Sequence, residues 1–416
     1  MNADLIRLGE NARRAAGALM VAAAPAKNAA LEAIARTLEE NAAEIFAANA
    51  EDIAAGKAAG IAPNLLDRML LDEKRLAGIV EGVRQVAALK DPIGEVLHAE
   101  TLPNGLIVSQ MRVPLGVVGM IYEARPNVTV DAFALCFKAG NAVILKGGSD
   151  ALESNKEIVK WLRKGLENCG LPADCVQLIT DTDREVTKQF MRMNGYIDVL
   201  IPRGGAGLIR TVVENSTVPV IETGTGNCHI YVDETADFDM ALDIIFNAKT
   251  QRISVCNSCE SLLIHRKIAK DFLPLLKKRL DEKQVEIRAD QESAAIVPDF
   301  KTATEEDWGM EYLDYILSVK QVDSVEDAIE HINRYNTGHS EAIITKDYDS
   351  SRKFLDGVDA AAVYVNASTR FTDGFEFGFG AEIGISTQKL HARGPMGLKE
   401  LTTTKYIIYG SGQVRP

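Results

Sequence analysis

One cysteine lies in a sequence context that suits a nucleophile. Cys256 stands in the segment 251–259, Gln-Arg-Ile-Ser-Val-Cys-Asn-Ser-Cys, between an expected helix and an expected strand. A loop between packed elements can hold a thiol rigidly and still expose it. An ordinary thiol is only a few per cent thiolate near pH 7, so a nucleophilic Cys256 needs a helix N-terminus or a nearby cation to activate it.

Two other interpretations of Cys256 stay open when the residues are considered alone. The thiol could be buried and structural, or it could form a redox or metal pair with Cys259. No second cysteine pair or spaced histidine pair accompanies these two, which speaks against zinc. The six cysteines, at 136, 169, 175, 228, 256 and 259, follow no disulfide-framework spacing. We therefore expect free thiols in a reducing compartment, and no metal.

Two glycine-rich segments stand where strands should give way to helices. Lys146 and Ser149 flank a glycine pair, and Gly204 and Gly205 follow Arg203 at a later junction. Backbone N–H groups at a helix start, with a lysine beside them, suit a phosphate, although such a turn is often only a turn. Neither segment is the G-x-G-x-x-G fingerprint. A basic residue where NAD-binding folds place a ribose-reading carboxylate favours the additional phosphate of NADP.

Glu222 and Asn127 are the remaining candidates for chemistry. Glu222 is expected at the carboxyl end of a strand over 218–222, where it would point into a crevice unless it is an ordinary surface carboxylate. Asn127 follows Pro126 in the segment 122–129, which crosses from a strand into a helix. Its side chain could simply cap that helix, or it could donate an amide N–H to an oxyanion.

The composition limits the class of protein that these residues can serve. A chain of 416 residues, 46% hydrophobic and 25% charged, is typical of a soluble protein with two or three domains. The net charge of −13 and the lack of a basic tract speak against nucleic-acid binding. No uncharged apolar run approaches the length of a membrane span. The N-terminal run after Arg13-Arg14 imitates a secretory signal, but its acidic residues and helical periodicity favour an amphipathic helix that breaks near Pro25.

The elements that must position the candidates alternate along the chain. The alanine-rich first 90 residues, punctuated by proline, predict helices, and Asn104-Gly105 predicts a hairpin over 100–113. Strands are expected at 117–122, 142–146, 176–180, 197–201, 218–222, 229–233, 261–265, 315–322, 341–345, 361–366 and 405–409. Helices are expected at 128–138, 150–168, 183–193, 206–214, 237–251, 267–280, 324–335 and 349–356. This pattern predicts an α/β chain with two doubly wound parallel sheets. For the first of them, built from the strands over 117–222, ligands are expected beyond the carboxyl ends of the strands.

Together these pieces resemble the aldehyde dehydrogenase superfamily, and most closely its γ-glutamyl phosphate reductase family. The order of the candidate residues along the chain is similar to that of the superfamily: an asparagine after a proline, a lysine after a strand, a glycine turn, a glutamate and then the cysteine. Two long segments, 322–343 and 380–398, resemble that family's signature throughout, as does Val255-Cys256-Asn257. The resemblance favours Cys256 as the nucleophile over the other two interpretations.

The resemblance implies a domain plan and a reaction. An NADP-binding domain would span 1–99 and 114–226 with part of 366–386, a catalytic domain 227–365, and a small β oligomerisation arm 100–113 and 387–416. A cytoplasmic homo-oligomer would use NADPH to reduce γ-glutamyl phosphate to glutamate 5-semialdehyde and phosphate, the second step of proline biosynthesis. Cys256 would form a thioester while Asn127 holds the oxyanion. Glu311 resembles the glutamate that holds the nicotinamide-side ribose.

Several points stay open at this stage. Glu222 resembles the glutamate that activates water in hydrolytic members, but here it could orient the cofactor or move a proton. The substrate's α-amino and α-carboxylate groups could be held by any of four residues, chosen by charge alone: Arg125, Arg370, His391 and Arg393. A hydrolytic NAD(P)-dependent aldehyde dehydrogenase is the alternative function. The sequence does not decide whether the oligomer is a dimer or a tetramer. It also does not decide whether a glutamate 5-kinase makes a transient contact and hands over the acyl phosphate.

Overall fold

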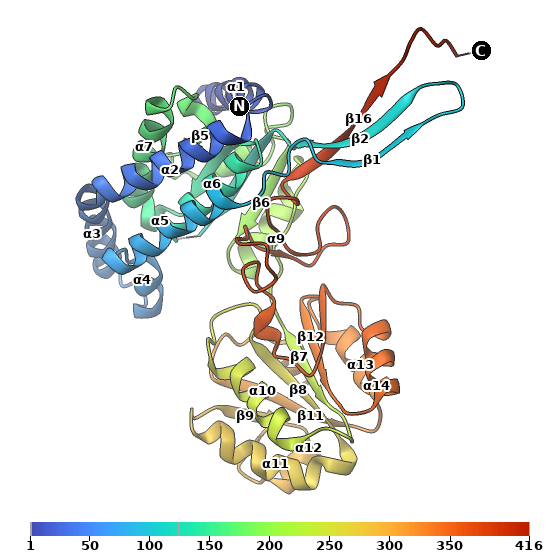
Figure 1. Ribbon diagram of the computed structural model, residues 1–416. Helices are drawn as coiled ribbons and strands as arrows, with labels where there is room; N and C mark the ends of the chain where they lie inside the picture. The colour runs from blue at the N-terminus through green and yellow to red at the C-terminus, as the bar shows by residue number, and fades with distance from the viewer. Residues whose placement is uncertain (1, 124, 416) are drawn as a thin grey trace. The chain divides into compact units, whose positions relative to one another are not determined.

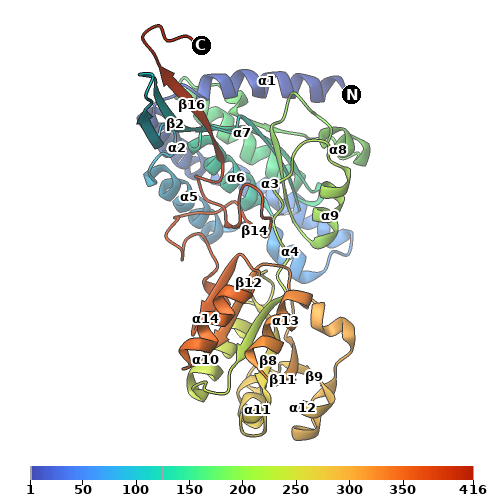
Figure 2. The ribbon, with the colours of Figure 1, turned by 90° about the vertical axis from the view of Figure 1, so that its right-hand side faces the viewer.

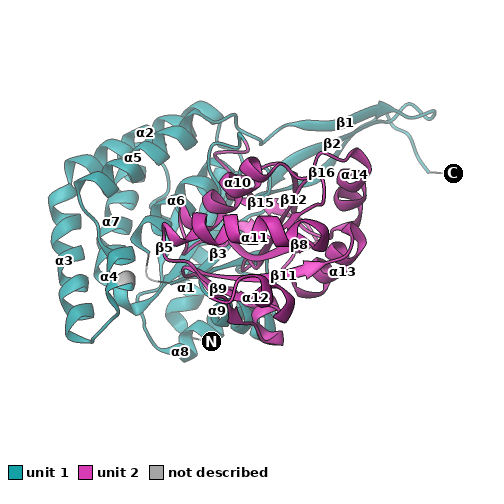
Figure 3. Cartoon of the chain, turned by 90° about the horizontal axis from the view of Figure 1, so that it is seen from below, with its two compact units in different colours: residues 1–222, 378–384, 396–416 teal, residues 223–377, 385–395 magenta. Residues whose placement is uncertain are grey.

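The computed structural model describes residues 2–123 and 125–415. The chain divides into two compact units, which Figure 3 colours separately. The first comprises residues 1–222, 378–384 and 396–416, and the second comprises residues 223–377 and 385–395. Each unit contains a parallel sheet with helices, and the first also carries a three-stranded antiparallel sheet. The prediction of two parallel-sheet units with a small β arm is confirmed.

The parallel sheet of the first unit has the strand order β5-β4-β3-β6. Its strands are β3 (Val117–Tyr122), β4 (Ala142–Gly147), β5 (Val176–Leu178) and β6 (Val199–Arg203). Every residue of β3 and β4 is buried, as expected for central strands covered on both faces. Tyr122 lies opposite both Gly147 and Arg203, so the carboxyl ends of β3, β4 and β6 meet at one edge.

Helices of the first unit owe their close packing to alanine. Ala30 and Ala35 of α2 are fully buried, because small side chains let the neighbouring helices approach. Pro25 lies in the first turn of α2, where proline costs no hydrogen bond, so the predicted break is observed. The bounds are α1 (Ala3–Leu19), α2 (Ala24–Glu40), α3 (Ala42–Ala58), α4 (Pro63–Met69), α5 (Glu73–Ala88), α6 (Pro126–Lys138), α7 (Leu152–Asn168), α8 (Arg184–Phe190) and α9 (Ala206–Asn215).

The strand predicted over 218–222 does not form as a regular strand. Val220 makes an isolated parallel bridge with Leu200, supported by Leu200 N–H to Pro219 C=O and Ile221 N–H to Leu200 C=O. Pro219 has no N–H to give to a ladder, and this limits the pairing. Glu222 therefore does not end a strand, as the sequence analysis expected, but follows a single bridge.

The arm of the first unit is the antiparallel sheet β1-β2-β16, which extends away from that unit's helices in Figures 1 and 3. It comprises β1 (Val96–Thr101), β2 (Ile107–Pro114) and β16 (Thr402–Tyr409). Gly105 has a φ of 86°, which suits the Asn-Gly turn that predicted this hairpin. β16 pairs with β2 along its whole length (Figure 2). The tail strand therefore pairs with the hairpin of its own chain.

The sheet of the second unit is wholly parallel, in the order β10-β9-β11-β8-β7-β12-β13. Its strands are β7 (Cys228–Val232), β8 (Cys259–His265), β9 (Glu286–Ala289), β10 (Lys301–Thr302), β11 (Ile316–Val322), β12 (Ser340–Ile344) and β13 (Ala362–Val365). The helices are α10 (Phe238–Thr250), α11 (Arg266–Asp281), α12 (Gln291–Ile296), α13 (Val325–Tyr335) and α14 (Tyr348–Gly357). β14 (Ile385–Ser386) and β15 (Gly394–Pro395) form a separate short pair.

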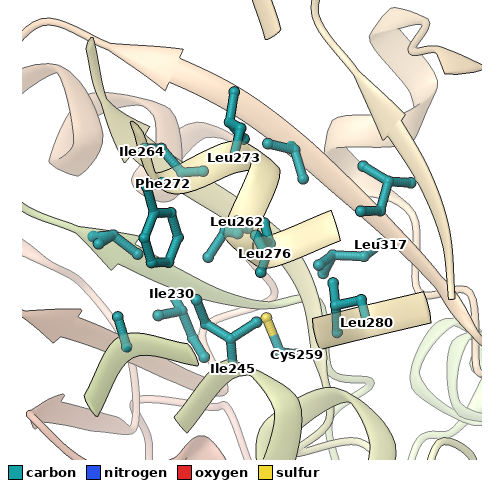
Figure 4. Close-up of a cluster of buried hydrophobic side chains, with 14 of the residues drawn as sticks. Ile230, Ile245, Cys259, Leu262, Ile264, Phe272, Leu273, Leu276, Leu280 and Leu317 are labelled. Carbon is teal, nitrogen blue, oxygen red and sulfur yellow. The ribbon is translucent and has the colours of Figure 1, made fainter. Parts of the chain in front are cut away.

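Alternation along the strands divides the core of the second unit between the two faces of its sheet. Ile230 packs with Ile245 of α10 and Phe272 of α11, in the cluster drawn in Figure 4. Tyr231, the next residue, packs with Phe354 of α14 on the other side. Successive side chains of a strand point to opposite faces, so helices cover both. This packing holds the strand ends, and the loops between them, in place.

Candidate active site

Cys256 lies on the loop between α10 and β8, at the amino ends of three neighbouring strands. Cys228 at the start of β7 lies opposite Cys259 at the start of β8, and β12, which begins at Ser340, pairs with β7. Cys256 therefore lies at the amino edge of its sheet, whereas ligands of open parallel sheets usually bind at the carboxyl edge. Cys256 is partly exposed, whereas Cys228 and Cys259 are buried.

A histidine that the sequence analysis left without a role contacts the thiol. Nε2 of His339 lies 3.1 Å from Sγ of Cys256, and Nδ1 lies 2.7 Å from Oγ of Ser340. That hydroxyl donates to Oγ1 of Thr372 at 2.7 Å, so it accepts the Nδ1–H of His339. Nε2 is then the acceptor nitrogen that faces the thiol. A buried histidine in this tautomer can take the Cys256 proton.

The neighbouring cysteines are poor candidates for the nucleophile. Burial raises the pKa of Cys228 well above its ordinary value, and it raises the pKa of Cys259 to about 12. The Cys228 thiol donates to the backbone carbonyl of Cys256 at 3.2 Å, which supports the loop. Burial and the raised pKa of Cys259 also speak against a redox pair between Cys256 and Cys259.

The backbone of Gly226 packs directly on the Cys256 loop. A Cβ built on Gly226 would lie 1.4 Å from the carbonyl oxygen of Cys256. The N–H of Gly226 donates to Oε1 of Glu311 at 2.7 Å. Glu311 thus holds the backbone at Gly226, which in turn supports the Cys256 loop. The predicted contact of Glu311 with a cofactor ribose stays a prediction.

Arg370 is the substrate-binding candidate that the structure brings beside the thiol. Nδ2 of Asn257, the residue after Cys256, donates to the carbonyls of Thr372 at 2.9 Å and of Arg370 at 3.3 Å. Thr369 Oγ1 donates back to the Asn257 carbonyl at 2.8 Å. Burial lowers the pKa of Arg370, and the neighbouring Cys256 opposes this shift. A guanidinium here can meet a carboxylate or a phosphate.

The other three substrate candidates have different surroundings. Nη2 of Arg393 pairs with Oδ1 of Asp359 at 2.6 Å, and both side chains are partly exposed. His391 is exposed and has a φ of 66°. Arg125 is the N-cap residue of α6 in the first unit. Their predicted contacts with a substrate stay predictions.

Lys146 is buried near the carboxyl end of β4, in the first unit. Its Nζ donates to the carbonyl of Gly147 at 3.2 Å, and burial lowers its pKa against the opposing charge of Asp181. A Cβ on Gly147 would lie 2.5 Å from Nδ2 of Asn155, a buried nitrogen with no hydrogen-bond partner among the described residues. Ser149 is exposed at the start of a 3-10 turn before α7. This cationic cradle fits an anionic cofactor group.

The glycine turn after β6 carries a carboxylate. Oε2 of Glu123 accepts the N–H of Gly205, the N-cap residue of α9, at 3.1 Å. A Cβ on Gly204 would lie 2.7 Å from Cδ of Glu123. A cofactor phosphate can use this turn only after Glu123 has moved away, which the sequence analysis did not foresee.

Asn127 lies inside the first turn of α6 and is not its cap. Its Nδ2 donates to Oδ2 of Asp131 at 3.0 Å. Burial raises the pKa of Asp131 to about 6, opposed by this hydrogen bond and by the charge of Arg203. The capping interpretation of Asn127 is therefore wrong. Glu222 is partly exposed at the end of the first unit's main segment, and its role is untested.

Two kinds of feature are absent from residues 2–123 and 125–415. No group of three His, Cys, Asp or Glu side chains in this part of the chain could hold a metal ion. No helix there combines the length and apolar character that crossing a membrane requires.

Comparison with known proteins identifies the family. The sequence profile of the "Aldehyde dehydrogenase family" matches residues 2–298 and 294–407. A γ-glutamyl phosphate reductase of Lachnospira eligens is 60% identical over 412 residues, which cover 99% of each chain. The chain belongs to the γ-glutamyl phosphate reductase family. The crystal structure of the Thermotoga maritima γ-glutamyl phosphate reductase is 49% identical, with a TM-score of 0.97 over 99% of this chain and 100% of that one.

More distant relatives share the aldehyde dehydrogenase fold. A γ-glutamyl phosphate reductase of Saccharomyces cerevisiae is 32% identical, with a TM-score of 0.56 over 100% of this chain and 99% of that one. An acetylating aldehyde dehydrogenase of Geobacillus thermoglucosidasius is 19% identical, with a TM-score of 0.71 over 99% of this chain and 98% of that one. This last likeness shows the fold alone.

His339 belongs to the reductase-family signature that the sequence analysis recognised, yet sequence reasoning missed its contact with the thiol. The available signal was chemical, since a nucleophilic cysteine commonly has a histidine as its base. The strand order was also needed, because only the pairing of β12 with β7 brings the start of β12 toward the thiol loop.

Proposed function

We propose that this chain reduces γ-glutamyl phosphate to glutamate 5-semialdehyde and phosphate with NADPH, through a thioester on Cys256. The observation that carries the proposal is the 3.1 Å contact between Nε2 of His339 and Sγ of Cys256. It joins a partly exposed thiol to a base of fixed tautomer. Membership of the reductase family supports the substrate, and the Lys146 cradle supports an anionic cofactor.

The proposed mechanism begins when His339 takes the proton of Cys256. The thiolate attacks the acyl carbon, the bond from that carbon to the phosphate oxygen breaks, and phosphate leaves a thioester behind. Asn127 and the backbone N–H of Cys256 are assigned to the developing oxyanion, a role worth about 10²–10³ in rate for one donor. When bound, the nicotinamide cofactor supplies the hydride that reduces the thioester. The aldehyde then departs, and His339 returns its proton to the sulfur.

The residues that would hold the cofactor are those of the first unit's carboxyl edge. Lys146 is assigned to the additional phosphate of NADPH, and Ser149 lies on the adjoining turn. Gly204 and Gly205 are assigned to a shared phosphate, which requires Glu123 to leave the Gly205 N–H.

The test of this function is the reverse reaction, followed as NADPH absorbance. Glutamate 5-semialdehyde and NADP are supplied with and without inorganic phosphate. We expect sustained NADPH formation only with phosphate, because phosphate must discharge the thioester. Equal rates without phosphate would support the alternative, a hydrolytic aldehyde dehydrogenase in which Glu222 activates water, and would refute the proposal.

The role of His339 has its own test, since alkylation of Cys256 by iodoacetamide measures the thiolate directly. His339→Gln removes the base, so a smaller fraction of the Cys256 thiol should be ionised at pH 7. The alkylation rate at pH 7 should fall roughly tenfold or more, while the rate above pH 9.5 should match the wild type. Unchanged alkylation at pH 7 would show that His339 does not ionise the thiol.

A further inference from the structure

Asp131 is a carboxylate without an assigned role that contacts a side chain proposed to act in the reaction. Its Oδ2 accepts the Nδ2–H of Asn127 at 3.0 Å, one turn earlier on α6. Arg203, at the end of β6, is the charged group that acts on it. The Asp131 pKa of about 6, raised by burial, leaves the carboxyl ionised at pH 7.5.

An ionised carboxylate fixes which way an asparagine amide faces. Carboxylate oxygens only accept hydrogen bonds, so the NH₂ end of the Asn127 amide must point toward Asp131. One N–H is then engaged, and the second N–H has a defined direction. Without the carboxylate the amide can turn about its last torsion, which would present its oxygen in place of an N–H. An oxygen at that place would repel an oxyanion.

We propose that Asp131 is a positioning residue that locks the Asn127 amide in the orientation that donates to the oxyanion. This inference rests on the proposed function of Asn127. It assigns Asp131 no contact with substrate or cofactor. The effect of Asp131 on the reaction must therefore pass entirely through Asn127.

A double-mutant cycle tests this dependence. Asp131→Asn keeps the size of the side chain but can donate as well as accept, so it no longer selects one amide orientation. Four proteins are compared: wild type, Asp131→Asn, Asn127→Ala and the double variant. The rate is the phosphate-dependent oxidation of glutamate 5-semialdehyde. Alkylation of Cys256 and the thermal midpoint serve as controls, since neither uses an oxyanion donor.

Asp131→Asn should lower kcat/KM roughly ten- to a hundredfold, the range for losing a charge-assisted hydrogen bond. Alkylation of Cys256 should be unchanged. In the Asn127→Ala background the same substitution should have no further effect on kcat/KM, because the side chain through which Asp131 acts is absent.

Three results would overturn the proposal, and they are distinguishable. An equal loss from Asp131→Asn with and without Asn127 would show that Asp131 acts independently. A full rate for Asp131→Asn alone would show that the lock is not needed. A full rate for Asn127→Ala would remove the oxyanion role of Asn127 itself, and so would reject that part of the proposed function together with the lock. If Asp131→Asn does not fold, Asp131→Leu, which removes the acceptor altogether, completes the same cycle.

Discussion

Substituting Gly226 by alanine should displace the loop that carries Cys256 by a distance that the structure defines. The added Cβ would lie 1.4 Å from the carbonyl oxygen of Cys256, 2.3 Å from its carbonyl carbon and 2.8 Å from its Cα. Ordinary contact begins near 3.4 Å, so the two backbones must separate by 3.4 − 1.4, about 2 Å. A misplacement of about 1 Å can already cost a reaction about 10²-fold. We expect kcat to fall at least a hundredfold.

The assay compares Gly226→Ala with Gly82→Ala, a glycine of α5 whose Cβ would meet open space. Gly82→Ala should keep full activity and gain up to about 1 kcal/mol in unfolding free energy, because alanine is the better helix former. Circular dichroism and thermal melts establish that Gly226→Ala is folded, and iodoacetamide measures its thiol. A folded Gly226→Ala protein with wild-type kcat and wild-type alkylation would refute the argument from close backbone approach.

Four other predictions concern the nucleophile, the cofactor and assembly. Cys256→Ser should retain under a few per cent of kcat with NADPH binding intact, because an alkoxide is hardly available near pH 7, whereas Cys259→Ser should keep most activity; fluorescence titration and turnover decide this. Lys146→Ala should raise the ratio of the KM for NADPH to the KM for NADH by about one to two decades, because one charge-assisted contact worth about 1.5–3 kcal/mol is lost. An equal rise in both KM values would show that Lys146 does not bind the additional phosphate of NADPH. Glu123→Gln should tighten NADPH binding about fivefold, measured by calorimetry. The neutral glutamine holds the Gly205 N–H less strongly than the carboxylate does, by roughly 1 kcal/mol, so a cofactor phosphate can replace it more easily. Weaker NADPH binding would contradict this. We expect the chain to form a homo-oligomer, because the exposed edge of the arm invites pairing. Deleting residues 401–416 removes β16, so light scattering should then show smaller species. An unchanged size at low micromolar concentration would refute a role of the arm in assembly.

The central strands could be predicted because a strand buried on both faces is a continuous run of apolar residues in the sequence. β3 begins and ends where its apolar run does, since both of its faces are covered. β9 was missed because its four residues, Glu286–Ala289, are half polar and carry no clear pattern. The 218–222 segment was overpredicted because an apolar run says nothing of the N–H that Pro219 lacks.

The candidate site was predictable in its residue types and not in its contacts. The Cys256 loop was recognisable from its sequence, and the family resemblance raised it above the alternatives. The contact with His339 depends on the pairing of β12 with β7, a partnership between segments far apart in the chain. The hydrogen bond from the Gly205 N–H to Glu123 likewise depends on the pairing of β3 with β6. Local sequence patterns do not encode such neighbours.

The thioester on Cys256 is the central claim, and mass spectrometry of the enzyme tests it most directly. The protein is mixed with glutamate 5-semialdehyde and NADP without phosphate, quenched in acid and digested. The account predicts a γ-glutamyl group on the peptide that contains Cys256, formed with one burst of NADPH per subunit and removed when phosphate is added before the quench. A burst of NADPH with that peptide unmodified, or the group on another residue, would contradict the account.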